Sequence, residues 1–385
     1  MSNVGSAVGV AASAGATGKS APGAAELISR LRPIAIRSLR RMYAPQEKLF
    51  VFRLRRQSGV IVRQGLSPRY TAITLIGLAE ADDSVRASIL GEHGLHDVCE
   101  RLKQEAGRSQ NLGDVALITW AAQAVGYPDR RWAWQKLMSL RPHDAAHPTV
   151  EAAWALAALC VDREAPCARQ REQLAQRLLG SFSRRAHVFP HVLGDPGKGL
   201  RAHVACFADQ VYPIHALSHY FMLAGERAAL QAAEACAGQI CRLQGDAGQW
   251  WWHYDYRTGD VVEGYPVYAI HQDAMAPMAL FALRQAGGAD FSKELEKGLA
   301  WLEGCPELGG GSLIDVDADL VWRKVARREP AKLSRALQAG ASRLHSALRV
   351  PGTDVAFPAT AVDYEDRPYH LGWLFYAWRE NHRQP

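Results

Sequence analysis

Apolar residues recur three and four positions apart in one segment after another along this chain, whereas short runs that alternate apolar and polar residues are scarce. A spacing of three and four places apolar side chains on one face of a helix, and strict alternation would indicate strands. The pattern therefore predicts an all-α protein.

Two kinds of helix are expected to alternate. The first kind is built from small and apolar residues on all sides. Segments of this kind lie at 70–79, 114–124 and 150–159, and three more begin near Tyr212, Tyr268 and Tyr369. The second kind has a polar face and lies near 91–105, 130–140, 166–180, 225–243, 290–303 and 330–347.

Buried helices alternating with amphipathic ones are typical of a ring of helical hairpins, whose inner helices surround a central well. We predict an (α/α)6 toroid that forms a single domain over residues 24–385. An open solenoid of helix pairs is the structural alternative. Residues 1–23 are rich in Ala, Gly and Ser and are predicted to be a disordered tail.

The inner helices of a toroid bring their N-terminal ends to one mouth, where the positive ends of the helix dipoles meet. Polar residues at such positions bind ligands or cap their own helices, and Asp114 is also explained as a cap. The segment from Asp363 to His370 precedes the last inner helix and would complete the mouth. The side chains expected there are Arg69, Tyr70, Asp114, His147, Glu151, Asp209, Tyr212, His215, Tyr268, His271, Asp273, Tyr369 and His370.

The richest segment is 244–273, in which Trp250, Trp251 and Trp252 are followed by acidic residues and His271. Large flat faces beside a few ionisable groups suit a site that binds sugar rings or a hydrocarbon. The segment therefore predicts the rim of a ligand pocket.

The stretch from Trp250 to Ala279 resembles a hairpin of the six-hairpin glycosidases, including the unsaturated glucuronyl hydrolases and, more distantly, the glucuronyl C5-epimerases. This resemblance implies a carbohydrate-active enzyme, in which Trp250 to Trp252 stack on sugar faces and Glu263, Asp255 or Asp273 acts as general acid or base. For elimination or epimerisation beside a uronic carboxylate, it implies instead that Tyr268 and His271 abstract and return the proton while arginines neutralise the carboxylate. The substrate-binding residues would be Trp250, Trp251, Trp252, Tyr212, His215, Tyr70, Arg69 and His370.

A second resemblance is to the toroids of terpenoid cyclases and protein prenyltransferases, carried by the Gln, Gly and Trp residues of 244–250. Asp315, Asp317 and Asp319 are similar to an acidic DxDD motif, with the third acid displaced by one residue. The same three residues are also explained as the start of a helix, with acids at its positive end. A toroid that binds a glycan or a protein without catalysis is a further alternative.

Composition narrows these classes. The chain is 48% hydrophobic and 22% charged, and no apolar run approaches the length of about 20 residues that a membrane span needs. The net charge of +6 is spread over arginine-rich patches such as Arg323 to Arg328, which we interpret as solvated helix faces and not as a nucleic-acid surface. Seven cysteines without CxxC spacing indicate reduced core residues. Residues 2–23 resemble a disordered tail better than a secretory signal, so the chain is expected to be cytoplasmic. No cofactor and no metal are predicted. The expected substrate is a small molecule or an oligosaccharide, and an anionic one is compatible with the sequence. The oligomeric state stays open.

Overall fold

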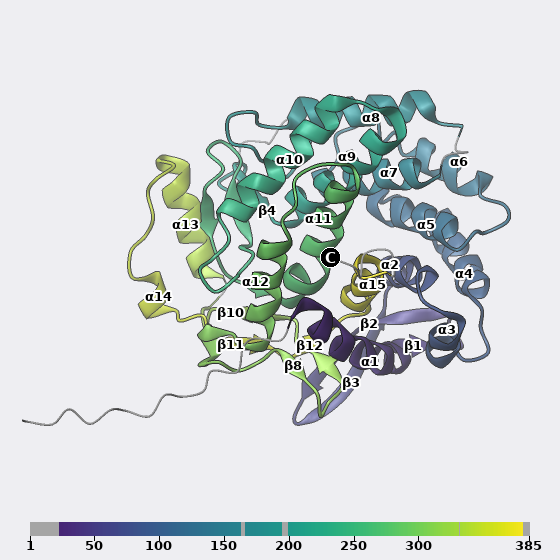
Figure 1. The fold of residues 1–385 in the computed structure, drawn as a ribbon, viewed down its shortest axis with the longest axis horizontal. Coiled ribbons are helices and arrows are strands. Elements are labelled where there is room, and N and C mark those ends of the chain that lie inside the picture. The colour runs from purple at the N-terminus through teal and green to yellow at the C-terminus, as the bar shows by residue number, and fades with distance from the viewer. Residues whose placement is uncertain (1–22, 163–165, 195–198, 331, 380–385) are drawn as a thin grey trace, which may run out of the picture.

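Six inner helices form a closed ring in the computed structural model, which describes residues 23–162, 166–194, 199–330 and 332–379 (Figure 1). Each helix packs on the next, and the last packs on the first, so the toroid is confirmed and the open solenoid is excluded. The predicted tail, apart from its last residue, lies outside the described residues. The ring consists of α2 (Pro68–Ala79), α5 (Leu112–Ala124), α7 (Thr149–Val161), α9 (Ala208–Ala224), α11 (Ala276–Gln285) with the preceding π-helical turn η1 (His271–Met275), and α15 (Pro368–Ala377).

Amphipathic helices surround this ring. Their buried residues face the inner helices, as the sequence pattern requires. The first of these outer helices, Ala24–Met42, packs against α15, so the first and last helices of the described residues lie side by side. The outer helices are α1 (Ala24–Met42), α4 (Leu95–Arg108), α6 (Arg131–Ser139), α8 (Ala168–Ser181), α10 (Arg227–Arg242) and α12 (Ser292–Glu303), with the short α3 (Asp83–Leu90) before α4.

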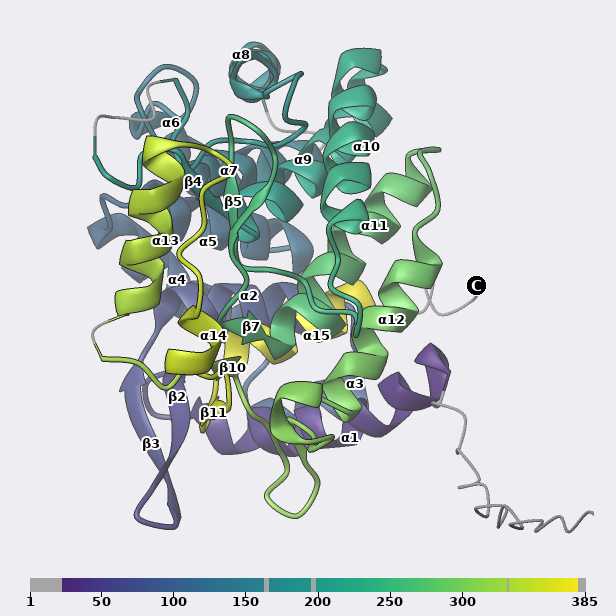
Figure 2. The ribbon, with the colours of Figure 1, turned by 90° about the vertical axis from the view of Figure 1, so that its left-hand side faces the viewer.

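The prediction that 330–347 forms an outer helix of the ring needs a correction. A helix is present as α13 (Leu333–Leu344), but it packs against strand β6 (Val261–Glu263), and α1 takes the outer position beside α15. Helix α13, the short α14 (Thr353–Ala356) and several strands lie together on one side of the molecule (Figure 2).

The seam between α15 and α2 depends on two glycines. A Cβ atom at Gly372 would lie 2.6 Å from the Cα atom of Thr74, and one at Gly77 would lie 2.0 Å from the carbonyl oxygen of Gly372. Only residues without a side chain allow the two helix backbones to approach this closely. The last inner helix therefore closes the ring through direct backbone contact.

Strands in the loops correct the all-α prediction. The described residues form four small antiparallel sheets beside the helical ring. They are β1 (Tyr43–Ala44), β2 (Leu49–Gln57), β3 (Val60–Leu66) and β12 (Glu365–Asp366); β4 (Val204–Cys206), β5 (His253–Asp255) and β6; β7 (Val267–Tyr268), β10 (Lys324–Ala326) and β11 (Ala361–Asp363); and β8 (Ile314–Asp315) with β9 (Leu320–Val321).

The longest hairpin, β2 and β3, had a sequence signal that the helical pattern obscured. Its turn is Ser58-Gly59, with φ angles of 48° and 82°. A two-residue turn with both central residues at positive φ matches the twist of a hairpin. The hairpin carries Phe52, which stacks on Tyr70 of α2, and Arg53, which pairs with Glu365 of β12.

The acidic residues 315–319 do not begin a helix. They belong to the β8–β9 hairpin, where Asp315 pairs with Arg56 at 2.9 Å and Asp319 pairs with Arg37 of α1 at 2.7 Å. The hairpin packs on the outer helix α1, and not inside the ring. Among the helices of the described chain, none has the length and apolar character needed to cross a membrane.

Candidate active site

Strand pairing sets the central part of the mouth. Strand β10 lies between β7 and β11, and its register places Lys324 opposite both Tyr268 and Asp363. Directly opposed residues of antiparallel strands point to the same side of a sheet. The Nζ atom of Lys324 accordingly lies 3.0 Å from Oδ2 of Asp363 and 5.4 Å from the ring centre of Tyr268.

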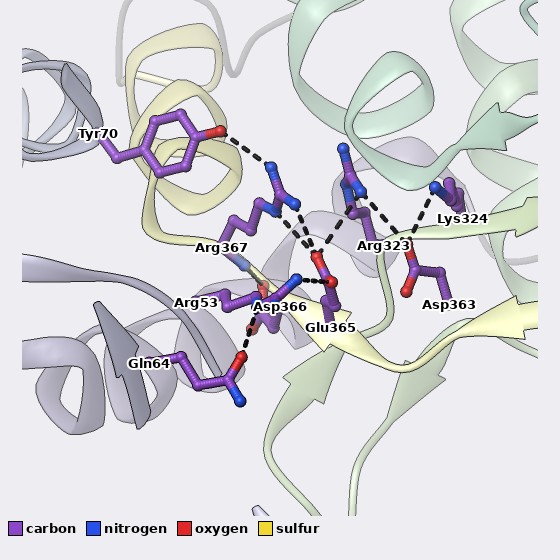
Figure 3. Close-up of polar contacts among 9 residues, drawn as sticks. All are labelled: Arg53, Gln64, Tyr70, Arg323, Lys324, Asp363, Glu365, Asp366 and Arg367. Carbon is purple, nitrogen blue, oxygen red and sulfur yellow. Dashed lines mark hydrogen bonds and ion pairs between the residues drawn. The ribbon is translucent and has the colours of Figure 1, made fainter. Parts of the chain in front are cut away.

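A cationic cluster surrounds the carboxylates of this region (Figure 3). Arg367 donates two hydrogen bonds to Oε2 of Glu365, at 3.1 and 2.8 Å, and Arg53 pairs with the other carboxylate oxygen. Arg323 lies between Asp363, at 3.2 Å, and Glu365, at 3.6 Å. We define the cationic cluster as Arg53, Arg323, Lys324 and Arg367 with Asp363 and Glu365.

The cluster has more positive than negative charges. Counted over these six residues, four cations face two carboxylates, a formal excess of two positive charges. The neighbouring Asp366 is outside this set, and its buried carboxyl accepts a hydrogen bond from Ser38. Burial and the neighbouring Arg323 lower the pKa of Lys324, as expected where cations are crowded. Such a site attracts anions, because each further negative charge relieves repulsion among the cations.

Tyr268 is the titratable group that this charge acts on. Burial raises the pKa of its phenol, while the charges of Arg323, Arg335 and Arg367 act in the opposite direction. The guanidinium carbon of Arg323 lies 5.2 Å from the centre of the Tyr268 ring. The hydroxyl is thus protonated at neutral pH, and the surrounding cations stabilise its deprotonated form.

Aromatic rings flank the cluster on both sides. Trp252 lies against Tyr268, with ring centres 4.7 Å apart, and is stacked on His271 at 5.4 Å and 13°. Across the mouth, Tyr70 stacks on Tyr369 at 4.5 Å. The hydroxyl of Tyr70 accepts a hydrogen bond of 2.9 Å from Arg367, which joins the second group to the cluster.

His271 lies beneath this surface as a neutral ring. Burial lowers its pKa to about 3, and its Nδ1 atom has no hydrogen-bond partner within the described chain. The rings of Phe207, Trp252 and Tyr268 cover it. The imidazole is therefore neutral at neutral pH, and it packs beneath the aromatic rings.

The three carboxylates that the first resemblance implies as acids or bases are each buried and held in a pair. Glu263 accepts hydrogen bonds of 3.0 and 3.2 Å from Arg327, Asp255 pairs with Arg257 at 2.7 Å, and Asp273 receives His370 Nε2 at 2.7 and 2.9 Å. The side chains of all three acids are at most 2% exposed. Each of the three buried acids is therefore held by an arginine or histidine partner.

Three of the proposed binding residues are part of the core. Trp250 is fully buried against Phe207, and Tyr212 packs edge-on against Trp154. His215 lies deeper along α9, where its Nε2 atom is 3.2 Å from the Tyr376 hydroxyl. These side chains hold the inner helices together.

Trp251 is half-buried and packs edge-on against Tyr265. Of the three adjacent tryptophans, Trp252 is therefore the one that meets Tyr268 and His271.

Arg69 belongs to a second polar group at the starts of α2, α5 and α7. It donates hydrogen bonds of 2.6 Å to both Asp114 and Asn111, and Glu151 accepts from the Asn111 amide at 3.1 Å. Asn111, and not Asp114, caps α5. The predicted cap at Asp114 is wrong because its carboxylate is taken up by Arg69 at the N-terminal ends of the inner helices.

The prediction that Arg323 to Arg328 form a solvated helix face is wrong. Arg323 and Lys324 lie at the start of a strand and are 20% and 16% exposed. The sequence signal for these cations was the acidic segment 363–366, since its carboxylates need nearby cations once they are buried.

A groove on the outer wall, lined by His143, Glu172, Arg177 and neighbours, includes none of the mouth residues.

Comparisons with known proteins agree with the toroid. No family model matches the chain, and no curated protein matches it. A solved unsaturated glucuronyl hydrolase specific for heparin is similar at 10% identity and a TM-score of 0.59, over 92% of this chain and 95% of that one. Cellobiose 2-epimerase from Bacillus thermoamylovorans has 10% identity and a TM-score of 0.59, over 93% and 99%. An unsaturated glucuronyl hydrolase from a Bacillus species has 12% identity and a TM-score of 0.56, over 92% and 95%. At these identities the likeness shows the shared fold.

Proposed function

We propose that this protein is a carbohydrate-processing enzyme that transfers a proton beside the carboxylate of a uronic sugar, as a lyase or an epimerase. The observation that carries the proposal is the position of Tyr268, between Trp252 and a cluster with two excess positive charges. Solved proteins with the same toroid that are named as glucuronyl hydrolases and as a sugar epimerase support the carbohydrate class.

The charge of the cluster fits this chemistry. A proton on the carbon next to a carboxylate is hard to remove, because the electron pair left behind meets an existing negative charge. Arg323 and Arg367 would neutralise the carboxylate, and the electrostatic stabilisation of such developing charge is a large contribution to catalysis. One bound carboxylate and one phenolate at Tyr268 would together balance the two excess charges.

The proposed step conserves atoms and electrons. Tyr268 first loses its own proton to solvent, and the phenolate then accepts the proton from the carbon that bears the carboxylate. In elimination, the electron pair forms a carbon–carbon double bond as the bond to the glycosidic oxygen breaks, and that oxygen takes up a proton from Tyr268 or from water. In epimerisation, a water molecule donates a proton to the opposite face of the same carbon, and Tyr268 returns its proton to solvent. Trp252 would hold the sugar ring by stacking in both cases.

The environment of the carboxylates favours this reaction over hydrolysis. A glycosidase uses two carboxyl groups that flank the bond to be cleaved. Glu263, Asp255 and Asp273 are each buried with a cationic or imidazole partner. Tyr268 has no such partner directly bonded to its hydroxyl among the described contacts, so it is the group that remains available.

The proposal is tested with purified protein and a panel of oligosaccharides that contain uronic acids, alongside neutral oligosaccharides of equal length. We expect turnover of acidic sugars alone, detected as a double bond by ultraviolet absorbance or as an epimer by NMR. Arg323→Gln should raise KM more than about tenfold, because one charge-assisted bond to the carboxylate is lost. Turnover of neutral sugars with equal efficiency would refute the proposal, and binding without turnover would favour a non-catalytic glycan-binding toroid.

A further inference from the structure

Three metal-ligand side chains from separate segments converge where β4 leads into α9. Cys206 is the last residue of β4, Asp209 lies in the first turn of α9, and His191 comes from the segment that follows α8. Their possible ligand atoms all lie within 4.8 Å of one another. The cysteine spacing predicts reduced core residues, and no metal is expected from the sequence.

The local backbone fixes this arrangement. Oδ2 of Asp209 accepts a hydrogen bond of 2.7 Å from the backbone N–H of Cys206, which orients the carboxylate toward the strand end. Nδ1 of His191 lies 3.0 Å from Oδ2 and 3.3 Å from Oδ1 of the same carboxylate. Two of the three ligands are therefore held by a short turn, and the third reaches them from a different segment.

The spacing suits a tetrahedral ion. Bonds of about 2.0 to 2.3 Å from zinc to nitrogen, oxygen and sulfur imply ligand atoms about 3.3 to 3.8 Å apart. The observed separations start at 3.0 Å and stay within 4.8 Å, so small side-chain rotations would bring all three to bonding distance. A sulfur, a nitrogen and an oxygen ligand together favour zinc and similar transition metals over magnesium or calcium.

Burial and charge provide a second argument. The side chain of Asp209 is fully buried. Among the described residues it forms an ion pair with His191, whose side chain is 57% exposed. A buried carboxylate is costly unless a cation compensates it. A divalent ion bound by Asp209, His191 and Cys206 would supply that compensation, and the exposed edge of His191 shows that the position is open to solvent.

We propose that His191, Cys206 and Asp209 bind one zinc-class divalent ion with three protein ligands and an open fourth position. Three ligands with an open position are typical of zinc sites that bind a further ligand, whereas structural sites have four. The site adjoins the proposed sugar site, since the backbone N–H of Phe207 donates to the carbonyl of Trp252 at 2.9 Å. The proposal does not depend on the proposed reaction.

Cobalt provides a direct test, because a thiolate bound to Co²⁺ gives a charge-transfer absorption band in the near ultraviolet. The full chain is treated with a chelator, freed from it and titrated with Co²⁺, and bound zinc is measured separately by elemental analysis. We expect the band, the visible absorption of a tetrahedral site, and one ion per chain.

Variants assign the ligands. Cys206→Ser should abolish the band, and His191→Ala should weaken binding at least about tenfold, since even changes behind the ligands cost 10–100-fold. His191 is largely exposed, so its removal should leave folding intact even if Cys206→Ser does not fold. Cys167→Ser is the matched control, because Cys167 lies at the start of α8, a 14-residue helix about 21 Å long. The other end of this helix, at Ser181, contacts the segment that carries His191, through a hydrogen bond from the backbone N–H of Gly194. Absence of the band in the unchanged protein, its survival in Cys206→Ser, or unaltered affinity in His191→Ala would overturn the proposal.

Discussion

Glu365 holds the cationic cluster together, and its charge can be removed with little change in shape by Glu365→Gln. The side chain is 5% exposed and is bound by Arg53 and Arg367, with Arg323 at 3.6 Å. Without the carboxylate charge, three guanidinium groups would face one another across an amide. Breaking a buried ion pair by removing one partner costs about 3–5 kcal/mol.

The expected loss is smaller than that range because the arginines are not fully buried. Their side chains are 23%, 11% and 20% exposed for Arg53, Arg367 and Arg323, so water screens part of the repulsion. We expect the free energy of unfolding to fall by about 2–3 kcal/mol. For a chain of this size, that loss should lower Tm by about 2–4 °C.

Thermal and urea unfolding followed by circular dichroism measure this loss. Asp363→Asn is the matched control, because Asp363 is 22% exposed and contacts fewer cations, so its loss should be about 1 kcal/mol. Added salt should recover part of the loss in Glu365→Gln by screening the arginines. If Glu365→Gln is as stable as the unchanged protein at low salt, the interpretation of the cluster as a set of crowded cations held by Glu365 is wrong.

Three further predictions follow from single contacts. Gly372→Ala should destabilise the protein by about 2–3 kcal/mol in urea unfolding, because its Cβ atom would lie 2.6 Å from Thr74 Cα, whereas Gly340→Ala, with nothing within 4 Å, should be neutral or stabilising. Burial lowers the pKa of His370, but Asp273 and Asp366 more than offset this and raise it above 6.5. The contribution of His370 to stability is therefore full below pH 6.5 and is lost as pH rises through the folded pKa. His370→Gln should remove this pH dependence from the free energy of unfolding measured against pH. Because burial raises the pKa of Tyr268 and the phenolate is the proton acceptor, kcat/KM should rise with pH through the alkaline range, and a profile that falls above neutral pH would speak against Tyr268 as the base.

The helical ring could be predicted from sequence because its signal is repeated. Inner segments such as 114–124 are apolar on all sides, and each outer helix shows a single apolar face. The closure of the ring by Gly77 and Gly372 could not be predicted, since close backbone contact depends on how two distant helices meet. The hairpin at Ser58-Gly59 was predictable from its turn and its alternation, but the helical pattern on both sides dominated the interpretation.

The ligand pocket that the aromatic segment predicts stays a prediction. The structure brings two of its residues together, Tyr268 and Trp252, with ring centres 4.7 Å apart. Glu263 is bound by Arg327, and Asp255 is bound by Arg257. Nothing in the sequence around Glu263 indicates that an arginine 64 positions away would bind it. Charge pairing between distant loops is decided by strand register, and the register of β10 between β7 and β11 appears only in the fold.

Proton exchange with solvent tests the central proposal most directly. The protein is incubated in deuterium oxide with an oligosaccharide that contains a uronic acid, and the carbon next to the carboxylate is followed by NMR. We predict that deuterium enters this position, or that the proton is lost with formation of a double bond. Tyr268→Phe should lower the rate about 10²–10⁴-fold while leaving sugar binding largely intact. An unchanged rate in Tyr268→Phe would contradict the assignment of Tyr268, and the absence of both exchange and elimination across acidic sugars that bind would contradict the proposed reaction.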